Sequence, residues 1–262
     1  MEKKYIQTPR GRVFYWISPR KAKTIMFTHG VTADHTLFDR QTAFWEKDYT
    51  VIEWDTPLHG ESRPYTDFTF AHLADDMLQI LDREGINRAV MAGQSAGGYA
   101  AQAFIQKYPQ RAQAFISIDS TPFGMKYYKK SELFWTDHYS DIAKWYPYGY
   151  YCTAAAKAVA LTEESRQSIY NCLVRLGKKG MLAAADAVYR DFPKYGEVTF
   201  TCPVLLLLGE HDKTGYVKRY TEMWAKETGY PLVTIPDAAH NSNYDNYDFF
   251  NRTVHEFLDQ NC

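Results

Sequence analysis

The chain has 262 residues, of which 45% are hydrophobic and 23% charged, a composition that excludes disorder as its dominant state. Lysine and arginine number 30 against 31 acidic residues, so the net charge of −1 gives no electrostatic reason to expect nucleic acid or an anionic membrane as a partner. A chain of this length can bury enough apolar surface to fold without disulfides or a structural metal.

Strands and helices are predicted to alternate along most of the chain. A hairpin is expected first, from Lys4–Thr8 and Arg12–Ile17 around a Pro-Arg-Gly turn. Apolar runs predict buried strands at Thr24–Thr28, Tyr49–Trp54, Ala89–Ala92, Phe115–Ile118, Val204–Leu208 and Leu232–Ile235. Helical spacing predicts helices at Phe70–Arg83 with Thr69 as cap, Tyr99–Lys107, Tyr216–Glu227 and Asn246–Leu258.

The middle of the chain has a different pattern. Eleven of the thirty-one residues from Thr121 to Tyr151 are aromatic, with no alternation typical of strands. Three helical stretches follow, near Thr153–Ala160, Glu163–Leu176 and Gly180–Arg190. We therefore expect an α/β fold, with a mostly parallel twisted sheet covered by helices on both faces. Its core would be 1–120 and 196–262, and 121–195 would form a helical cap inserted over one end of the sheet.

The cysteines and the apolar segments of the sequence bear on the cellular compartment of the protein. The cysteines Cys152, Cys172, Cys202 and Cys262 are few and scattered, as expected for reduced thiols in the cytoplasm. No apolar segment follows the N-terminus, and the longest aliphatic run, Val204–Leu208, is too short to span a bilayer. We expect a cytoplasmic protein without a signal peptide or a membrane span.

The strongest chemical signal is Gly93-Gln94-Ser95-Ala96-Gly97. It matches G-x-S-x-G, follows an apolar strand and opens a helix, which is the context in which a sharp turn presents a serine hydroxyl. The turn leaves no room for side chains at its flanks, hence the glycines. The backbone N–H of Ala96 would face an oxyanion formed beside Ser95. The alternative is a merely structural glycine-rich turn.

A serine hydroxyl needs a base beside it to act as a nucleophile near neutral pH. His240 lies in a polar loop after the last predicted strand, and Asp212 follows the strand Val204–Leu208. An acid at that place would hold the imidazole in one tautomer and stabilise its charged form. The chain order of Ser95, Asp212 and His240 is that of an α/β-hydrolase.

With these motifs the chain resembles the α/β-hydrolase superfamily over nearly its whole length. His29-Gly30-Val31 resembles the family's oxyanion segment, in which the residue after His-Gly donates its backbone N–H. The segment from Asp55 to Ser62 resembles the family's Asp-x-x-Gly-x-Gly-x-Ser loop, although Leu58 stands where a glycine is usual.

The resemblance implies a serine hydrolase of a small carboxylic ester, thioester or lactone. Ser95 would attack the carbonyl, His240 would move the proton, and Asp212 would orient His240. The backbone N–H groups of Val31 and Ala96 would bind the oxyanion. Water would then hydrolyse the acyl-enzyme. We expect a small-molecule acyl substrate, no cofactor and no metal.

Other interpretations remain open for individual residues. Asp119 also ends a strand and is an alternative acid. His29, Asp34, His35 and Asp39 lie close in sequence, but without the spacing of binuclear zinc hydrolases. Arg63 is a candidate for binding a substrate carboxylate, or simply a solvated loop arginine.

Alternatives also remain for the function and for the aromatic residues. A C–C bond hydrolase of the same fold is one alternative function, and a small-molecule receptor using the same pocket is another. Most aromatic residues of the cap are expected to pack in its core, and some to line an acyl or alcohol pocket. They are Phe123, Tyr127, Tyr128, Phe134, Trp135, Tyr139, Trp145, Tyr146, Tyr148, Tyr150 and Tyr151.

Overall fold

A computed structural model describes the backbone of residues 1–262 and all side chains except those of Trp135 and Asp137, so the interpretation of Trp135 lies outside the described residues. Its centre is an eight-stranded sheet in the order β1-β2-β4-β3-β5-β6-β7-β8. Strands β1 and β2 form an antiparallel hairpin, and β2 is antiparallel to β4, whereas every pairing from β4 to β8 is parallel. The predicted α/β fold with a mostly parallel sheet is confirmed.

The strands are β1 Glu2–Thr8, β2 Gly11–Ile17, β3 Lys23–Thr28, β4 Tyr49–Trp54, β5 Ala89–Gln94, β6 Ala112–Ile118, β7 Val204–Gly209 and β8 Leu232–Ile235. The α-helices are α1 Asp39–Trp45, α2 Phe70–Arg83, α3 Ala96–Lys107, α4 Lys130–Asp137, α5 Tyr139–Ala143, α6 Tyr148–Val159, α7 Glu163–Asp191, α8 Val217–Thr228, α9 Ser242–Asp245 and α10 Tyr247–Asn261. Short 3₁₀ turns lie at His35–Phe38, Pro109–Arg111, Met125–Tyr127 and Phe192–Lys194.

Both faces of the central strands are buried, which explains the continuous apolar runs of β4, β5 and β7. In β3, Met26 belongs to the hydrophobic cluster that α2, α3 and α8 cover. Its neighbours Ile25 and Phe27 belong to a second cluster, which α1 and α10 cover. The same alternation occurs in β5, because successive side chains of a strand point to opposite faces.

Helix α2 shows how local sequence sets an element. Thr69 has extended backbone angles, and its side chain accepts a hydrogen bond from the backbone N–H of His72, as an N-cap does. Residues such as Leu73, Met77 and Ile80 recur at helical spacing and are buried against the sheet. The helix begins and ends at the residues that the sequence predicts.

The structure corrects the prediction in the helical parts. Helix α1 and the short helices α4 and α5 are not among the predicted elements. The two helices expected at Glu163–Leu176 and Gly180–Arg190 are one assigned element, α7, with a non-helical residue at Gly177 (φ 73°, ψ 160°). The predicted break is therefore a single-residue kink instead of a loop.

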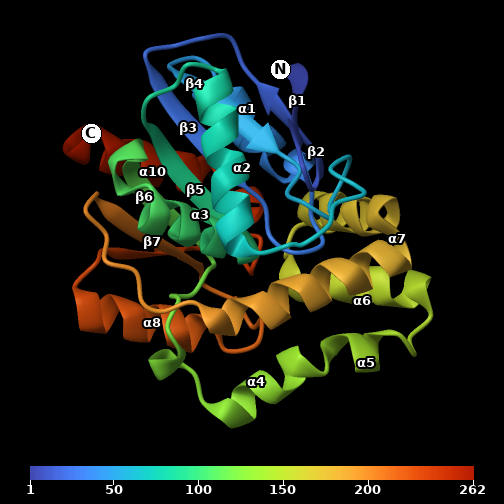
Figure 1. The fold of residues 1–262 in the computed structure, drawn as a ribbon. Helices are drawn as coiled ribbons and strands as arrows, with labels where there is room; N and C mark the ends of the chain where they lie inside the picture. Colours follow the sequence, from blue (N-terminus) through green and yellow to red (C-terminus); the bar gives the residue numbers. More distant parts are fainter.

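The segment between β6 and β7 carries α4, α5, α6 and α7, and Figure 1 shows these helices gathered at one end of the molecule. We call residues 121–195 the cap, using the boundaries predicted from the sequence. The first half of α7 is fixed to the body at Arg175, whose guanidinium binds the Asp34 carboxylate with Nε–Oδ2 at 2.9 Å. Among the described residues, no helix is long and apolar enough to cross a membrane.

Candidate active site

Ser95 lies in the turn between β5 and α3, directly after the strand and before the first helical residue. Its backbone has φ 50° and ψ −120°, a conformation that residues other than glycine rarely adopt. Its N–H donates to the carbonyl oxygen of Ile118 at 2.9 Å, and its own carbonyl accepts from Gly98 N–H at 2.9 Å. These bonds hold the strained backbone in place, as expected where strain serves a site.

The glycines beside Ser95 are required by close backbone contacts. A Cβ atom on Gly97 would lie 2.0 Å from the carbonyl oxygen of Thr28, and one on Gly93 would lie 2.3 Å from that of Gly97. Gly30 is similarly restricted, because a Cβ there would lie 2.3 Å from Oε1 of Gln94. The turn after β5 and the turn after β3 therefore pack against each other without room for side chains.

His240 lies between Ser95 and Asp212. Its Nε2 is 3.0 Å from Oγ of Ser95, and its Nδ1 is 2.8 Å from Oδ2 of Asp212. The side chain of Gln94 anchors the His240 loop, because its Nε2 donates to the His240 carbonyl oxygen at 2.7 Å. Three segments far apart in the sequence thus meet at the carboxyl ends of β5, β7 and β8, where ligands bind in such sheets.

The environment shifts the pKa values of both His240 and Asp212. Burial lowers the pKa of His240, but the Asp212 carboxylate outweighs burial, and the net pKa is raised above 6.5. Burial raises the pKa of Asp212, but His240 and the backbone N–H of Thr214 outweigh it, and the net pKa is lowered. Asp212 is therefore held in its ionised form, and its carboxylate favours the protonated form of His240.

Asp119, the alternative acid, lies close by but does not bind His240 directly. Its carboxylate accepts hydrogen bonds from the backbone N–H of Gly209 at 2.7 Å and of Ser242 at 3.1 Å. Burial, followed by the negative charge of Asp212, raises the pKa of Asp119 to about 7. Asp119 links the β7 turn to the loop after His240, whereas Asp212 contacts the imidazole itself.

Val31 and Ala96 line the same cavity as Ser95 and His240. Beside Val31, the backbone N–H of Thr32 donates to Nε2 of His59 at 3.1 Å. Burial and the neighbouring His29 lower the pKa of His59 to about 3, so His59 stays neutral and can accept this bond. Sequence analysis assigned no role to His59, which the structure places in support of the segment containing Val31.

The His29 side chain links two neighbouring segments. Its Nδ1 is 2.8 Å from the Gly30 carbonyl oxygen, and its Nε2 accepts from Thr56 N–H at 3.0 Å. Burial lowers its pKa. It ties the turn after β3 to the loop after β4.

A cavity of about 310 Å³ opens beside Ser95, at the lower end of the ~300–1,000 Å³ typical of ligand sites. Only part of its lining was foreseen: of the aromatic residues of the cap, Tyr128 and Tyr139 line it, whereas Phe123 is in the core and the Trp145 side chain is 81% exposed. The lining residues that sequence analysis missed come from both the cap and the body of the molecule, and they share no motif. They are Tyr99, Thr121, Glu132, Leu133, Thr136, Val188, Tyr189, Phe192, Thr214, Gly215, Tyr216, Val217 and Tyr220.

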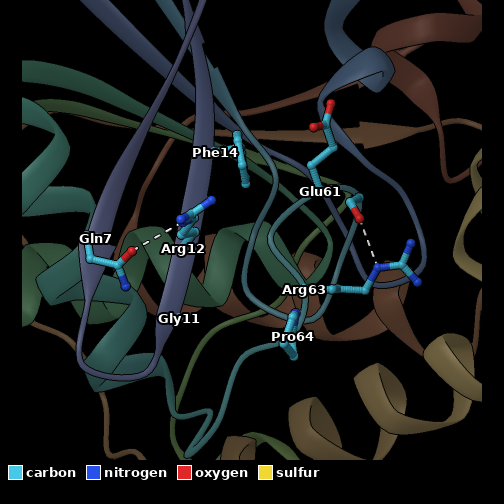
Figure 2. Close-up of a pocket in the computed structure, with 8 residues that line it drawn as sticks. Gln7, Gly11, Arg12, Phe14, Glu61, Arg63 and Pro64 are labelled. Atoms are coloured by element: carbon cyan, nitrogen blue, oxygen red, sulfur yellow. Dashed lines mark hydrogen bonds between the residues drawn. The ribbon is translucent and has the colours of Figure 1, made fainter.

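Arg63 does not line this cavity. It lines a separate surface hollow between the β1–β2 hairpin and the loop after β4, shown in Figure 2 with Gln7, Arg12 and Glu61. Its Nε donates to the Gly60 carbonyl oxygen at 2.8 Å, and its Nη1 donates to the Leu176 carbonyl oxygen at 2.8 Å. Arg63 therefore binds a carbonyl just before the kink of α7 and lies outside the lining of the Ser95 cavity.

The residues considered for a metal have other partners. Asp34, His35 and Asp55 bring their donor atoms within 4.8 Å of one another. Asp34 binds Arg175, however, and Nδ1 of His35 is 2.8 Å from Oδ1 of Asp55. These bonds account for the cluster as a structural network that joins the turn after β3 to α7.

Comparison with known proteins identifies the family of the chain. The alpha/beta hydrolase fold family matches residues 23–171, more than half of the chain. A bifunctional esterase/perhydrolase of Acinetobacter calcoaceticus is 26% identical over 232 residues, which cover 80% of this chain and 82% of that protein.

Two solved structures superpose over almost the whole chain. A thermophilic esterase from Thermogutta terrifontis has a TM-score of 0.83 at 20% identity, covering 99% of both chains. The enol-lactonase from Burkholderia xenovorans has a TM-score of 0.80 at 21% identity, covering 97% of this chain and 99% of that one. With the family match, these likenesses establish that the chain belongs to the alpha/beta hydrolase fold family.

Proposed function

We propose that the protein is a serine hydrolase that cleaves small carboxylic esters or lactones through an acyl-enzyme, with thioesters as a variant. The observation that carries the proposal is the continuous contact from Asp212 through His240 to Ser95 at the wall of a cavity. Relatives named as esterases and an enol-lactonase support hydrolysis of ester bonds.

The geometry supports a defined sequence of steps. Neutral His240 accepts the Ser95 proton through Nε2 as the hydroxyl attacks the substrate carbonyl, and the imidazolium so formed is stabilised by Asp212. His240 then protonates the leaving alcohol, which leaves the acyl group on Ser95. A water molecule deprotonated by His240 attacks this ester, and Ser95 recovers its proton.

The negative oxygen of each tetrahedral intermediate needs preorganised donors. We assign this role to the backbone N–H groups of Val31 and Ala96, which lie on the two turns packed together beside Ser95. Removing one such donor typically costs about 3–4 kcal/mol of transition-state stabilisation. Because backbone groups supply them, the site depends on the turn geometry and little on the side chains of these two residues.

The remaining predictions fit this proposal. Residues 121–195 act as a cap that covers the acyl cavity, since α4 and α7 supply part of its lining. The thiols of Cys152, Cys172, Cys202 and Cys262 are free, which supports a reducing, cytoplasmic location.

The test is product release over time from a panel of 4-nitrophenyl esters, simple lactones and a 1,3-diketone, with substrate in large excess over enzyme. We expect many turnovers per molecule on short-chain substrates. Release that stops after one equivalent would indicate a receptor, and cleavage of a C–C bonded diketone but of no ester would indicate a C–C bond hydrolase.

A further inference from the structure

The described lining of the cavity contains a carboxylate but no lysine or arginine side chain. Among the described residues that line it, Glu132 and His240 are the only ones with an ionisable acidic or basic side chain apart from the tyrosines. No lysine or arginine belongs to this described lining, and neither Trp135 nor Asp137 in the same helix is basic.

The guanidinium beside Glu132 is already bound to it. Nη1 and Nη2 of Arg219 donate to the two carboxylate oxygens of Glu132 at 2.8 and 2.6 Å, and the Tyr220 hydroxyl donates to the same carboxylate. The Arg219 guanidinium also lies over the rings of Tyr216 and Tyr220, 5.1 and 4.9 Å from their centres. A bidentate pair of this kind uses the parallel N–H donors with which arginine recognises carboxylates. These donors of Arg219 are therefore not available to a ligand carboxylate.

A second carboxylate lies behind Ser95, because Asp212 is 2.8 Å from His240. The Arg219 guanidinium holds the pKa of Glu132 down to about 2, so this carboxylate is ionised at any working pH. The rest of the lining consists mainly of tyrosine rings and aliphatic side chains, which favour uncharged groups.

We propose that this site selects uncharged acyl groups and rejects acyl chains that end in a carboxylate, and that Glu132, paired with Arg219, is the specificity-determining residue. A substrate carboxylate beside Glu132 would lose its hydration without gaining a cation, and like charges would face each other. Discrimination by such a repulsive element is a common means of specificity. The inference rests on the proposed function and adds the substrate class.

The experiment compares 4-nitrophenyl pentanoate with mono-4-nitrophenyl glutarate, which differ by a carboxylate in place of the terminal methyl group. The rate with Ser95→Ala is subtracted for each ester. We expect kcat/KM to be at least about 100-fold lower for the glutarate ester. Equal kcat/KM values would overturn this inference alone, whereas hydrolysis of neither ester would contradict the proposed function as well.

Two variants test the assignment to Glu132. Glu132→Gln and Arg219→Gln both break the same ion pair between α4 and α8, so any loosening of the cap is common to both. Glu132→Gln releases the guanidinium and should reduce the discrimination against the glutarate ester by about 10-fold, while Arg219→Gln should preserve or increase it. Equal effects of the two variants on the ratio would assign the pair a purely structural role and overturn the proposal.

Discussion

The turn that carries Ser95 and the cap side of the cavity are built in different ways. Around Ser95 the geometry is set by backbone atoms, with Gly93 and Gly97 in contacts that exclude a Cβ. On the cap side, side chains from α4, α7, α8 and the loop before α8 form much of the wall. The comparison indicates that the reaction depends on the backbone at one edge of the sheet, whereas substrate choice depends on replaceable side chains.

The largest expected effect is that of Ser95→Ala. Removing the hydroxyl should lower kcat for ester hydrolysis by about 10⁵-fold or more, since the steps of the acyl-enzyme route all pass through it. The midpoint of thermal unfolding should change little, because the side chain has few packing contacts to lose. Hydrolysis at the wild-type rate by this variant would show that Ser95 is not the nucleophile.

Next in size is the effect of the acid. Asp212→Asn should lower kcat by about 10⁴-fold, because it removes the charge that stabilises the imidazolium and leaves His240 in the wrong tautomer. Asp119→Asn, as the matched control, should lower kcat by less than about 100-fold, because Asp119 contacts backbone N–H groups and not the imidazole. The reverse ranking in steady-state assays would assign the acid to Asp119.

The pH profile provides a third, smaller effect. His240 must be neutral to accept the proton, so kcat/KM should fall about tenfold per pH unit below the pKa of His240, which lies above 6.5. In Asp212→Asn this limb should move to lower pH, because the carboxylate that raises the pKa is gone and burial remains.

Asp119 also titrates in this range, with a pKa raised to about 7 by burial and by Asp212. The profile should therefore be repeated with Asp119→Asn. We expect the acidic limb to persist in that variant. Its disappearance would assign the limb to Asp119 and contradict the role of His240 as base.

The smallest effect is expected on the cap side. Leu133 on α4 lines the cavity, and Leu133→Ala should shift the preferred acyl chain length upward, changing relative kcat/KM values by about 10-fold, the size of a one- or two-methylene effect. The kcat on the best substrate should stay within a few-fold of wild type, measured over esters of two to ten carbons. A loss of kcat as large as that of Asp212→Asn would contradict the view that the cap side sets substrate choice and not the reaction itself.

The same contrast explains how far the sequence alone leads. β4, α2 and β8 begin and end where their patterns predict, because apolar runs and a capping threonine determine them locally. The meeting of Ser95, Asp212 and His240 was predictable because their motifs follow three strands whose ends share one edge. The lining of the cavity was not predictable. Glu132, Tyr189 and Tyr216 meet there only because of the tertiary fold, and their spacing in the sequence forms no motif.

His59 is an instructive omission. Its loop was recognised by resemblance, but its bond to the Thr32 N–H beside Val31 depends on the packing of two turns 27 residues apart. Leu58, which stands where a glycine is usual, has φ 71°, in the left-handed region that favours glycine.

The central claim is that the structure activates the Ser95 hydroxyl as a nucleophile. The most direct measurement is the intact mass of the wild-type protein and of Ser95→Ala after incubation with a small fluorophosphonate. We predict one covalent adduct on the wild type and none on the variant. An equal adduct on both proteins, or none on either, would contradict the claim.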